Sequence, residues 1–431
     1  MSNTELERGF AEVRNTPIDI ARLQLNTYNR IYAEVCKMPV IDTHEHLSWN
    51  GDNINPSDAD VLAEYLIHYM SSDIRSAGLS NADFEKVVNR ETDIMERWNI
   101  VEPYWEFARY TGYGRALDIA VKGIYGINGV NRDTIVELNR VFRENHTAGH
   151  YTRVLKDLCN IEVSLLDDWT WATEPVTSPL FKRAWQPTPL ITPNDEVLKG
   201  FNSLDDWLNH METQLDKQLE FNGTRFIKTA IAYSRTLKFD KVDYNVAKEQ
   251  FNTALETKWF QKELQDYCMH HLMKLANDRN LTVQFHTGLL EGNGNTLSNS
   301  DPSLLNNLFL EYPNVDFDLF HISYPYQNIA AALCKMFPNV FIDMCWAHIM
   351  SPNASVLALS EFLDAVPYNK ISAFGGDYCF VDGVYGHLYL ARENVSKTLA
   401  DKVNQGIFSE DKAIEIAHAL FYDNPKRIFK L

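Results

Sequence analysis

The 431-residue sequence lacks the features by which several protein classes are recognised. Its six cysteines are scattered and form no CxxC pair, a pattern typical of reduced, buried thiols rather than of a disulfide framework. No apolar run approaches the roughly 18 residues that a membrane span requires. The formal net charge is −18, and Lys and Arg form no run. These absences argue against binding to nucleic acid or to a membrane surface. Because residues 1–15 show no signal-peptide pattern, we expect a cytoplasmic protein.

Short segments rich in Val, Ile, Phe and Leu alternate with longer helical stretches, which is typical of βα units in a parallel sheet. We predict eight strands, of which the third has the weakest pattern: 39–43, 161–166, 189–192, 225–232, 281–286, 315–321, 340–345 and 371–375. Eight strands separated by helix-length spacers predict an α/β fold, the (β/α)₈ TIM barrel, which accommodates a chain of this length when it carries insertions.

The spacing between the first two strands is unusually long. Residues 47–160 show a helix start near 56–58 and helical periodicity over 82–98, 104–124 and 131–143. We interpret them as a large α-helical insertion after the first strand, over the carboxyl end of a barrel spanning 39–431. The insertion could act as a lid or as the contact of a homo-oligomer. Residues 1–38 are predicted to form an N-terminal helical segment that packs on the barrel.

Histidines and one aspartate follow the predicted strands at their carboxyl ends. His44 and His46 come after the first strand, two residues apart, so their side chains point the same way. His286 ends the fifth strand, His321 ends the sixth, and Asp377 follows the eighth. Barrel enzymes place their chemistry at this face. Since neutral imidazoles and a carboxylate are ligands of Zn²⁺ and similar ions, the pattern predicts a metal site.

Lys228 is unusual because it lies inside the fourth predicted strand, between apolar residues. Lysine is rarely buried without a partner. It could be carbamylated and bridge two metal ions, or it could be a cation that orients an anionic substrate. A lysine that extends to the barrel rim would give the same sequence pattern.

Three further residues are candidates for substrate binding. Arg235 lies just beyond the fourth strand and Arg115 lies in the insertion, and either guanidinium could hold a carboxylate. Trp169, with Trp171, follows the second strand and could form a pocket wall. Surface ion pairs and packing of the insertion would account for the same residues.

The motifs at the strand ends together resemble the amidohydrolase superfamily of metal-dependent barrels. Their flanking segments are similar to the amidohydrolase-related branch that includes uronate isomerases and FluG-type metal-dependent hydrolases. These segments are IKTAIAYSR, QFHTGLLEGNG, HISYPYQNIAAALCKMFPNVFIDMCW and VPYNKISAFGGD. The resemblance covers the barrel from about residue 39 onward and is poorer for the insertion.

The resemblance implies roles for individual residues. His44, His46 and Asp377 would be metal ligands, and His286 would be either a ligand or a substrate contact. His321 would polarise or contact the substrate. In this branch the lysine at the position of Lys228 is often not a bridging ligand, so the resemblance implies one divalent ion, with zinc expected first.

Three functions remain open at this stage. In a metal-dependent hydrolase, Asp377 would transfer a proton from metal-activated water to the leaving group, and the metal and His321 would stabilise the oxyanion. Lys228 is a further candidate catalytic residue. Its substrate would be a small amide, lactone or ester, with a carboxylate held by Arg235 or Lys228. The alternative is a uronate or sugar-acid isomerase, or a decarboxylase, although VYGHLYLAR lacks the arginine-rich start of the isomerase loop. A non-catalytic binding or assembly protein is the third.

Overall fold

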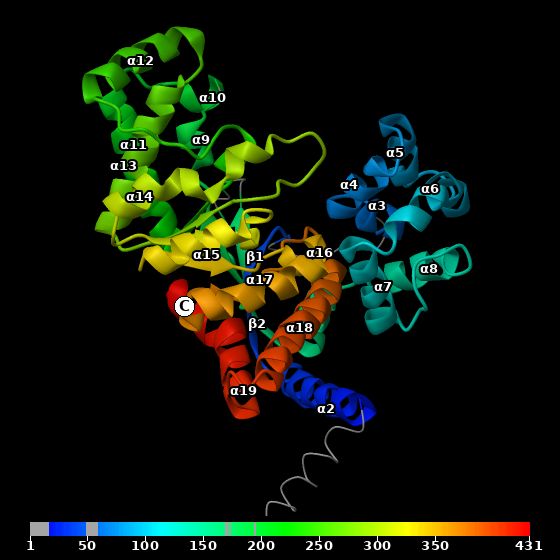
Figure 1. Cartoon of the computed structure of the whole chain (residues 1–431). Helices are drawn as coiled ribbons and strands as arrows, with labels where there is room; N and C mark the ends of the chain where they lie inside the picture. Colours follow the sequence, from blue (N-terminus) through cyan, green and yellow to red (C-terminus); the bar gives the residue numbers. More distant parts are fainter. Residues whose placement is uncertain (1–16, 49–58, 169–170, 172–173, 194) are drawn as a thin grey trace, which may run out of the picture.

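Eight parallel strands form the centre of the molecule (Figure 1). The computed structural model describes residues 17–48, 59–168, 171, 174–193 and 195–431. Each strand pairs with the next one along the chain, in the order β1 to β8. The strands are β1 Val40–Glu45, β2 Ile161–Asp168, β3 Phe181–Trp185, β4 Phe226–Thr229, β5 Thr282–Phe285, β6 Asp316–Leu319, β7 Val340–Asp343 and β8 Ile371–Ser372.

Backbone hydrogen bonds between β1 and the segment that follows β8 complete the ring. The N–H of Thr43 donates to the carbonyl of Phe374 at 3.1 Å, and the N–H of Asp377 donates to the carbonyl of His44 at 2.8 Å. The predicted TIM barrel is therefore confirmed. These contacts also bring the residues after the last strand against those that end the first.

The prediction for the third strand was wrong in position. The strand is Phe181–Trp185, whereas the predicted segment 189–192 largely forms helix α9, Thr188–Ile191. The charged residues Lys182 and Arg183 interrupt the apolar pattern of this strand in the sequence, although Arg183 is buried. Pro189 lacks the N–H that an interior strand would need and suits the first turn of a helix.

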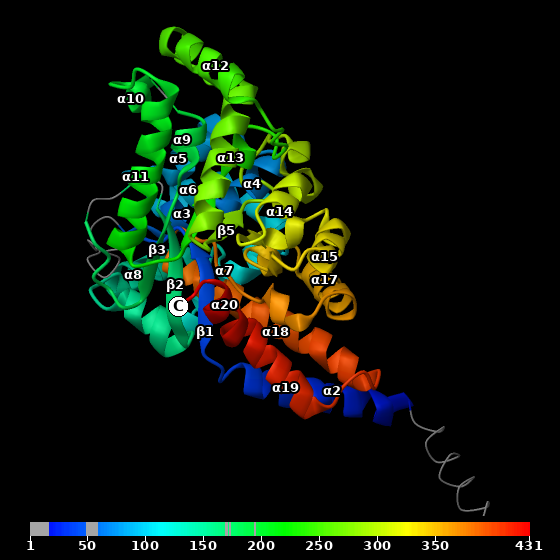
Figure 2. The same cartoon turned by 90° about the vertical axis from the view of Figure 1, so that its left-hand side faces the viewer.

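Helices surround the barrel and bury their apolar faces against it (Figure 2). Among the described residues, no helix is both long and apolar enough to cross a membrane. The helices of eight or more residues after β3 are α11 Leu204–Asn222, α12 Tyr244–Thr257, α13 Lys262–Asp278, α15 Gln327–Met336, α17 Pro352–Ala365, α18 Val381–Asn404 and α19 Glu410–His418. Shorter helices are α10 Asp195–Leu198, α14 Asn306–Glu311, α16 Ala347–Met350 and α20 Asn424–Ile428.

Seven helices lie between β1 and β2 in the described part of the chain. They are α3 Val61–Tyr65, α4 Tyr69–Ser76, α5 Asn81–Val88, α6 Ile94–Ala108, α7 Gly112–Tyr125, α8 Ile135–Asn145 and the π-helix η2 Thr152–Leu158. Two predicted helices are each split. Asp93 caps α6 by accepting from the N–H of Met95, and Thr111 caps α7, so both residues start a new helix.

The insertion packs closely against the barrel helices. Helix α7 contacts α16 and α18. A Cβ atom on Gly112 would lie 1.8 Å from the carbonyl oxygen of Ile349, and one on Gly386 would lie 2.0 Å from that of Ala116. Because only glycine permits these approaches, the insertion is a closely fitted wall of the molecule.

The N-terminal helix α2, Pro17–Val35, packs against α18 and α19. Ile31 and Val35 are fully buried in this contact, and Arg30 pairs with Glu410 at 2.9 Å. Helix α2 therefore covers the side of the barrel formed by the last helices of the chain.

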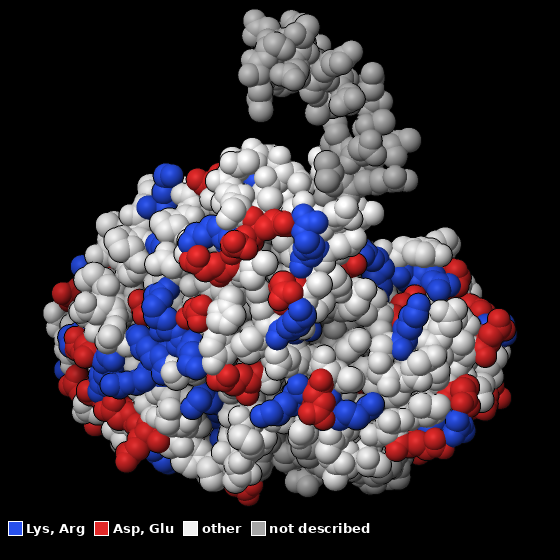
Figure 3. All heavy atoms as spheres, turned by 90° about the horizontal axis from the view of Figure 1, so that it is seen from below, with Lys and Arg blue, Asp and Glu red and all other residues white. Residues whose placement is uncertain are grey.

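The surface carries both signs of charge. In the face that Figure 3 shows, Lys and Arg lie beside Asp and Glu and form no separate field of one sign. The net charge of −18 therefore does not appear on this face as one continuous acidic area.

Candidate metal centre and pocket

Three donor atoms converge where β1 and the segment after β8 meet. His44 Nε2 lies 3.3 Å from His46 Nε2, and Asp377 Oδ1 lies 3.3 Å from the first and 3.1 Å from the second. At zinc–nitrogen distances near 2.05 Å, two ligand atoms of a tetrahedral ion lie about 3.3 Å apart. The three spacings therefore fit donors that share one ion.

The backbone holds Asp377 in an unfavourable conformation. Its φ is +58°, in the left-handed region that costs a non-glycine residue roughly 1–2 kcal/mol. Its N–H donates to His44, and its carbonyl accepts from the hydroxyl of Tyr69 at 2.6 Å. These two bonds fix the direction of the carboxylate, one from the barrel and one from the insertion.

The protonation states suit a metal site. Burial, reinforced by the positive charge of Lys228, lowers the pKa of His44 to about 4, so this imidazole is neutral at pH 7 and can act as a ligand. Burial alone would raise the pKa of Asp377, but the neighbouring histidines hold it well below its usual range. Neutral imidazoles and an ionised carboxylate fit zinc or a similar divalent ion.

His286 and His321 face each other beside this centre. His286 Nε2 lies 2.9 Å from the carbonyl of Leu289, and His321 Nδ1 lies 3.0 Å from that of Cys345. A carbonyl only accepts, so we assign the proton of each ring to these nitrogens. Burial lowers the pKa of His321 to about 3, so the ring is neutral. The facing atoms, His286 Nδ1 and His321 Nε2 at 3.2 Å, are then both acceptors.

Lys228 points into the metal centre. Its side chain is buried, and Nζ lies 3.2 Å from His44 Nε2 and 3.5 Å from Asp167 Oδ2. Burial would raise the pKa of Asp167, but the charge of Lys228 lowers it below its usual value, so the pair is ionic. Gln186 Nε2 donates to both Asp167 oxygens at 3.0 Å. This arrangement differs from that of a lysine extending to the rim.

A pocket of about 490 Å³ opens over these residues, within the usual range for small-molecule sites. Its walls come from the barrel and from the insertion. They are formed by His46, His68, Tyr69, Asp167, Gln186, Lys228, Ala230, Tyr233, His286, Glu291, Asp377 and Cys379.

Comparison with known families agrees with this geometry. Residues 195–431, more than half of the chain, match the family described as amidohydrolase. The chain belongs to the amidohydrolase family. The resemblance at the strand ends is thereby confirmed, and the three-donor centre agrees with the metal dependence of the family.

Individual proteins are similar over different shares of the chain. Protein fluG of Emericella nidulans is 30% identical over 176 residues, which are 39% of this chain and 20% of that protein. This chain thus matches only about a fifth of fluG. The uronate isomerase of Thermotoga maritima superposes with a TM-score of 0.76 at 17% identity, over 94% of this chain and 97% of that one. The glucuronate isomerase of Caulobacter crescentus gives 0.74 at 16% identity, over 94% of each chain. At these identities the two structures share the fold.

Two arginines predicted to bind substrate do not line the pocket of this amidohydrolase. Arg235 pairs with the buried Asp266 at 2.7 Å and also donates to the carbonyl of Lys238. Its charge is thus satisfied outside the pocket. Arg115 lies on α7 and is not among the lining residues. Neither lies among the described residues that line the pocket.

The structure describes only one of the two tryptophans that were predicted to form a pocket wall. Trp169 lies outside the described residues. Trp171 donates from Nε1 to the carbonyl of Gln186 at 2.8 Å and packs against Trp185. It therefore supports the segment after β3 that carries Gln186.

Several pocket residues of the amidohydrolase escaped the sequence analysis. Asp167 lies directly after the second predicted strand, so the rule applied to His286 would have found it. Glu291 follows His286 in a glycine-rich loop, which was a weaker signal. His68 had none, because it is a single histidine in an apolar part of the insertion.

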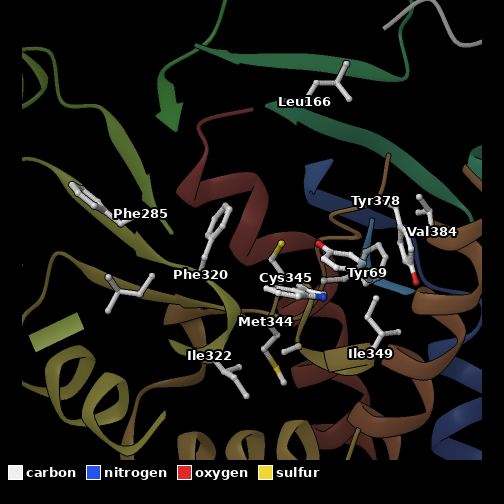
Figure 4. Close-up of a cluster of buried hydrophobic side chains, with 14 of the residues drawn as sticks. Tyr69, Leu166, Phe285, Phe320, Ile322, Met344, Cys345, Ile349, Tyr378 and Val384 are labelled. Atoms are coloured by element: carbon white, nitrogen blue, oxygen red, sulfur yellow. The ribbon is translucent and has the colours of Figure 1, made fainter. Parts of the chain in front are cut away.

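The insertion supplies His68 and Tyr69 at the start of α4. Burial lowers the pKa of His68 to about 4. Tyr69 stacks on Trp346 at 4.6 Å and on Tyr113 at 5.2 Å between ring centres. Figure 4 shows Tyr69 close to Cys345 and Tyr378 at the junction of insertion and barrel. One wall of the pocket is thus fixed by aromatic packing.

Proposed function

We propose that this amidohydrolase is a metal-dependent hydrolase of a small amide, lactone or ester. The observation that carries the proposal is the set of three donors on His44, His46 and Asp377, which are 3.1–3.3 Å apart. They lie at a pocket that also contains the buried cation of Lys228. Metal, base and cation side by side are the groups that hydrolysis of an acyl bond requires.

His44, His46 and Asp377 would hold one divalent ion, and zinc fits this donor set best. A bound ion of this kind polarises a carbonyl group and makes water acidic near neutral pH. Asp377 directs Oδ1 toward both histidines, which leaves Oδ2 to accept a proton from the attacking water. The same oxygen then gives the proton to the leaving nitrogen or oxygen.

Lys228 is the group best placed to stabilise the negative oxygen that develops on the substrate. Its ammonium carries three donors, and the contact to Asp167 uses one of them, because His44 Nε2 would be occupied by the metal. The neutral rings of His286 and His321 each donate their one N–H to a backbone carbonyl. We therefore assign oxyanion stabilisation to Lys228 and assign His321 the role of an acceptor.

The charge of the pocket argues for a substrate without a carboxylate. Lys228 is the one Lys or Arg among the described lining residues, and it is paired with Asp167. A uronate would need a second cationic group, and Arg235 is committed to Asp266. The lack of a second Lys or Arg among the described lining residues favours hydrolysis over sugar-acid isomerisation.

The proposal is tested by elemental analysis and hydrolysis assays on the wild type, Asp377→Asn and Asp401→Asn. We expect about one equivalent of zinc per wild-type chain, with affinity reduced at least about 100-fold in Asp377→Asn. Hydrolysis of small amides and lactones should fall at least about 1,000-fold in that variant. Asp401 is exposed on α18, so Asp401→Asn should match the wild type in both measurements.

Other results of these measurements would support a different function. Conversion of uronates between aldose and ketose forms, without hydrolysis of any acyl substrate, would support the isomerase. Two equivalents of metal would indicate that Lys228 is carbamylated and bridges the ions. A wild type that binds no metal would leave a binding protein as the better interpretation.

A further inference from the structure

Glu291 presents a carboxylate to the pocket from the loop after β5. The backbone around it is anchored on both sides. Its N–H donates to the hydroxyl of Tyr233 at 3.0 Å, and its carbonyl accepts from Nδ2 of Asn295 at 2.6 Å. The position from which the side chain enters the pocket is therefore fixed by bonds that do not involve the carboxylate.

The carboxylate itself has no hydrogen bond or ion pair with another side chain in the described part of the chain. It is partly buried, and burial followed by the charge of Asp377 raises its pKa above the usual value. A partly buried carboxylate without a partner is destabilising. Such a group in a pocket wall is consistent with a partner that arrives with the ligand.

The other acidic groups of the pocket already have partners. Asp377 contacts His44 and His46, and Asp167 accepts from Lys228 and Gln186. The one Lys or Arg among the described lining residues, Lys228, is paired with Asp167, and Glu291 has no Lys or Arg partner among them.

Other parts of the protein could offer a cation. His46 and then Arg75 on α4 lower the pKa of Glu291 somewhat. His46 is one of the three metal donors, and the guanidinium of Arg75 lies over the ring of Phe84 at 4.2 Å. Arg75 is not among the lining residues. Segments 49–58, 169–170 and 172–173, which follow β1 and β2, contain no Lys or Arg in their sequence. The structure thus points to the ligand as the source of positive charge.

We propose that Glu291 makes the pocket selective for substrates that carry a protonated amine in addition to the reacting acyl group. The ammonium of the substrate would donate to the Glu291 carboxylate while its carbonyl lies at the metal centre. The inference names the substrate class of the proposed hydrolase and rests on that function for the reacting group. The pairing itself requires only the pocket and its metal.

The experiment measures binding, so that it does not depend on turnover. The probes are three series of hydroxamates, which chelate the metal through one end. Their other end is an ammonium, a methyl or a carboxylate group, separated by two to five methylene groups. Isothermal titration of the zinc-loaded wild type should give, at the best length, about tenfold tighter binding of the ammonium probe than of the methyl probe, as for a charge-assisted hydrogen bond. The carboxylate probe should bind most weakly.

Two variants assign the preference to one residue. In Glu291→Gln the ratio of ammonium to methyl affinities should fall from about tenfold to near one. In Glu256→Gln, which changes an exposed residue of α12, the ratio should stay at the wild-type value. Equal binding of ammonium and methyl probes by the wild type, or an unchanged ratio in Glu291→Gln, would overturn the inference and leave the metal centre standing.

The remaining outcomes separate this inference from the proposed function. An ammonium preference that depends on Glu291, in a protein that hydrolyses no acyl substrate, would support the inference and refute the hydrolase. Failure of all three probe series to bind the zinc-loaded protein would refute both.

Discussion

The floor of the pocket and its insertion wall are built on different physical principles. The floor consists of residues at the strand ends, His44, His46, Lys228, His286 and Asp377, placed by the register of a parallel barrel. The wall consists of helices α3 to α8, held by aromatic stacking and close glycine contacts. Strand ends of a barrel converge by geometry, whereas the wall depends on particular side chains fitting one another. The floor is therefore the more predictable region.

A buried polar cluster joins the two regions. Asp382 opens α18, five residues after Asp377, and its oxygens accept from three groups of the insertion. Tyr65 and Tyr125 donate to Oδ2 at 2.7 and 2.6 Å, and His150 Nε2 lies 3.0 Å from Oδ1. Three groups of the insertion thus converge on a single carboxylate of the barrel.

The largest expected effect comes from weakening this cluster. Asp382→Asn keeps the shape but removes the negative charge and one acceptor, leaving a buried donor without a partner. We expect the free energy of unfolding in urea to fall by about 3 kcal/mol, as when a buried charged network loses one member. Asp401→Asn on the same helix is exposed and should change it by less than about 0.5 kcal/mol.

The same variant tests whether the insertion wall and the barrel unfold together. Unfolding of Asp382→Asn should remain a single transition by both circular dichroism and tryptophan fluorescence, because the aromatic contacts persist. Two separate transitions would show that the insertion folds independently of the barrel. A loss below about 1 kcal/mol would remove Asp382 as the main connection between them.

Much of the floor followed from the sequence because chain position determines it. His44, His46, His286 and Asp377 each lie where a βα loop begins, and the barrel brings such positions together. Asp167 satisfies the same rule but was overlooked, and the second strand in fact ends at Asp168, two residues beyond its predicted end.

The wall and the outer contacts did not follow from the sequence. No periodicity marks His68, whose place depends on where α4 begins. Arg235 was predicted at the pocket, but Asp266, far away in sequence, satisfies its guanidinium. The third strand was misplaced because two charged residues interrupt its apolar pattern. Each of these depends on a contact between distant segments that composition and spacing do not encode.

The second prediction uses two histidines with opposite pKa shifts, one in the barrel and one in the insertion wall. On helix α16 of the barrel, burial lowers the pKa of His348 to about 4. In the wall, burial alone would lower the pKa of His146, but Glu64 at 3.2 Å raises it above its usual value. As pH falls from 6.5 toward 4, the unfolded chain binds a proton that folded His348 refuses, so this residue's contribution to stability is lost. His146 behaves oppositely, contributing fully below pH 6.5 and losing its contribution as pH rises through its folded pKa.

The measurement is the free energy of unfolding of His348→Gln and His146→Gln relative to the wild type between pH 8 and pH 5. The cost of His348→Gln should shrink by about 2 kcal/mol between pH 7.5 and pH 5, because the wild type loses that stability. The cost of His146→Gln should grow as the pH falls from 8 to 6. Parallel changes in both variants would contradict the opposite electrostatic settings of these two histidines in the barrel and the wall.

The smallest expected effect tests whether the wall acts on the metal centre through one hydrogen bond. Tyr69→Phe removes the hydroxyl that donates to the carbonyl of Asp377 at 2.6 Å and keeps the stack on Trp346. We expect a stability loss of about 1 kcal/mol, as for a single neutral hydrogen bond, and zinc affinity weakened by less than about tenfold. Tyr113→Phe, in the same stack, should leave zinc affinity unchanged, since it is the hydroxyl of Tyr69, and not that of Tyr113, that donates to Asp377. Asp377 already has a strained backbone, so losing one of its two restraints should allow the carboxylate to turn.

A Tyr69→Phe variant with lower stability but wild-type zinc affinity would mean that the bond to His44 alone orients Asp377. The wall would then shape the pocket without changing the affinity of the metal centre.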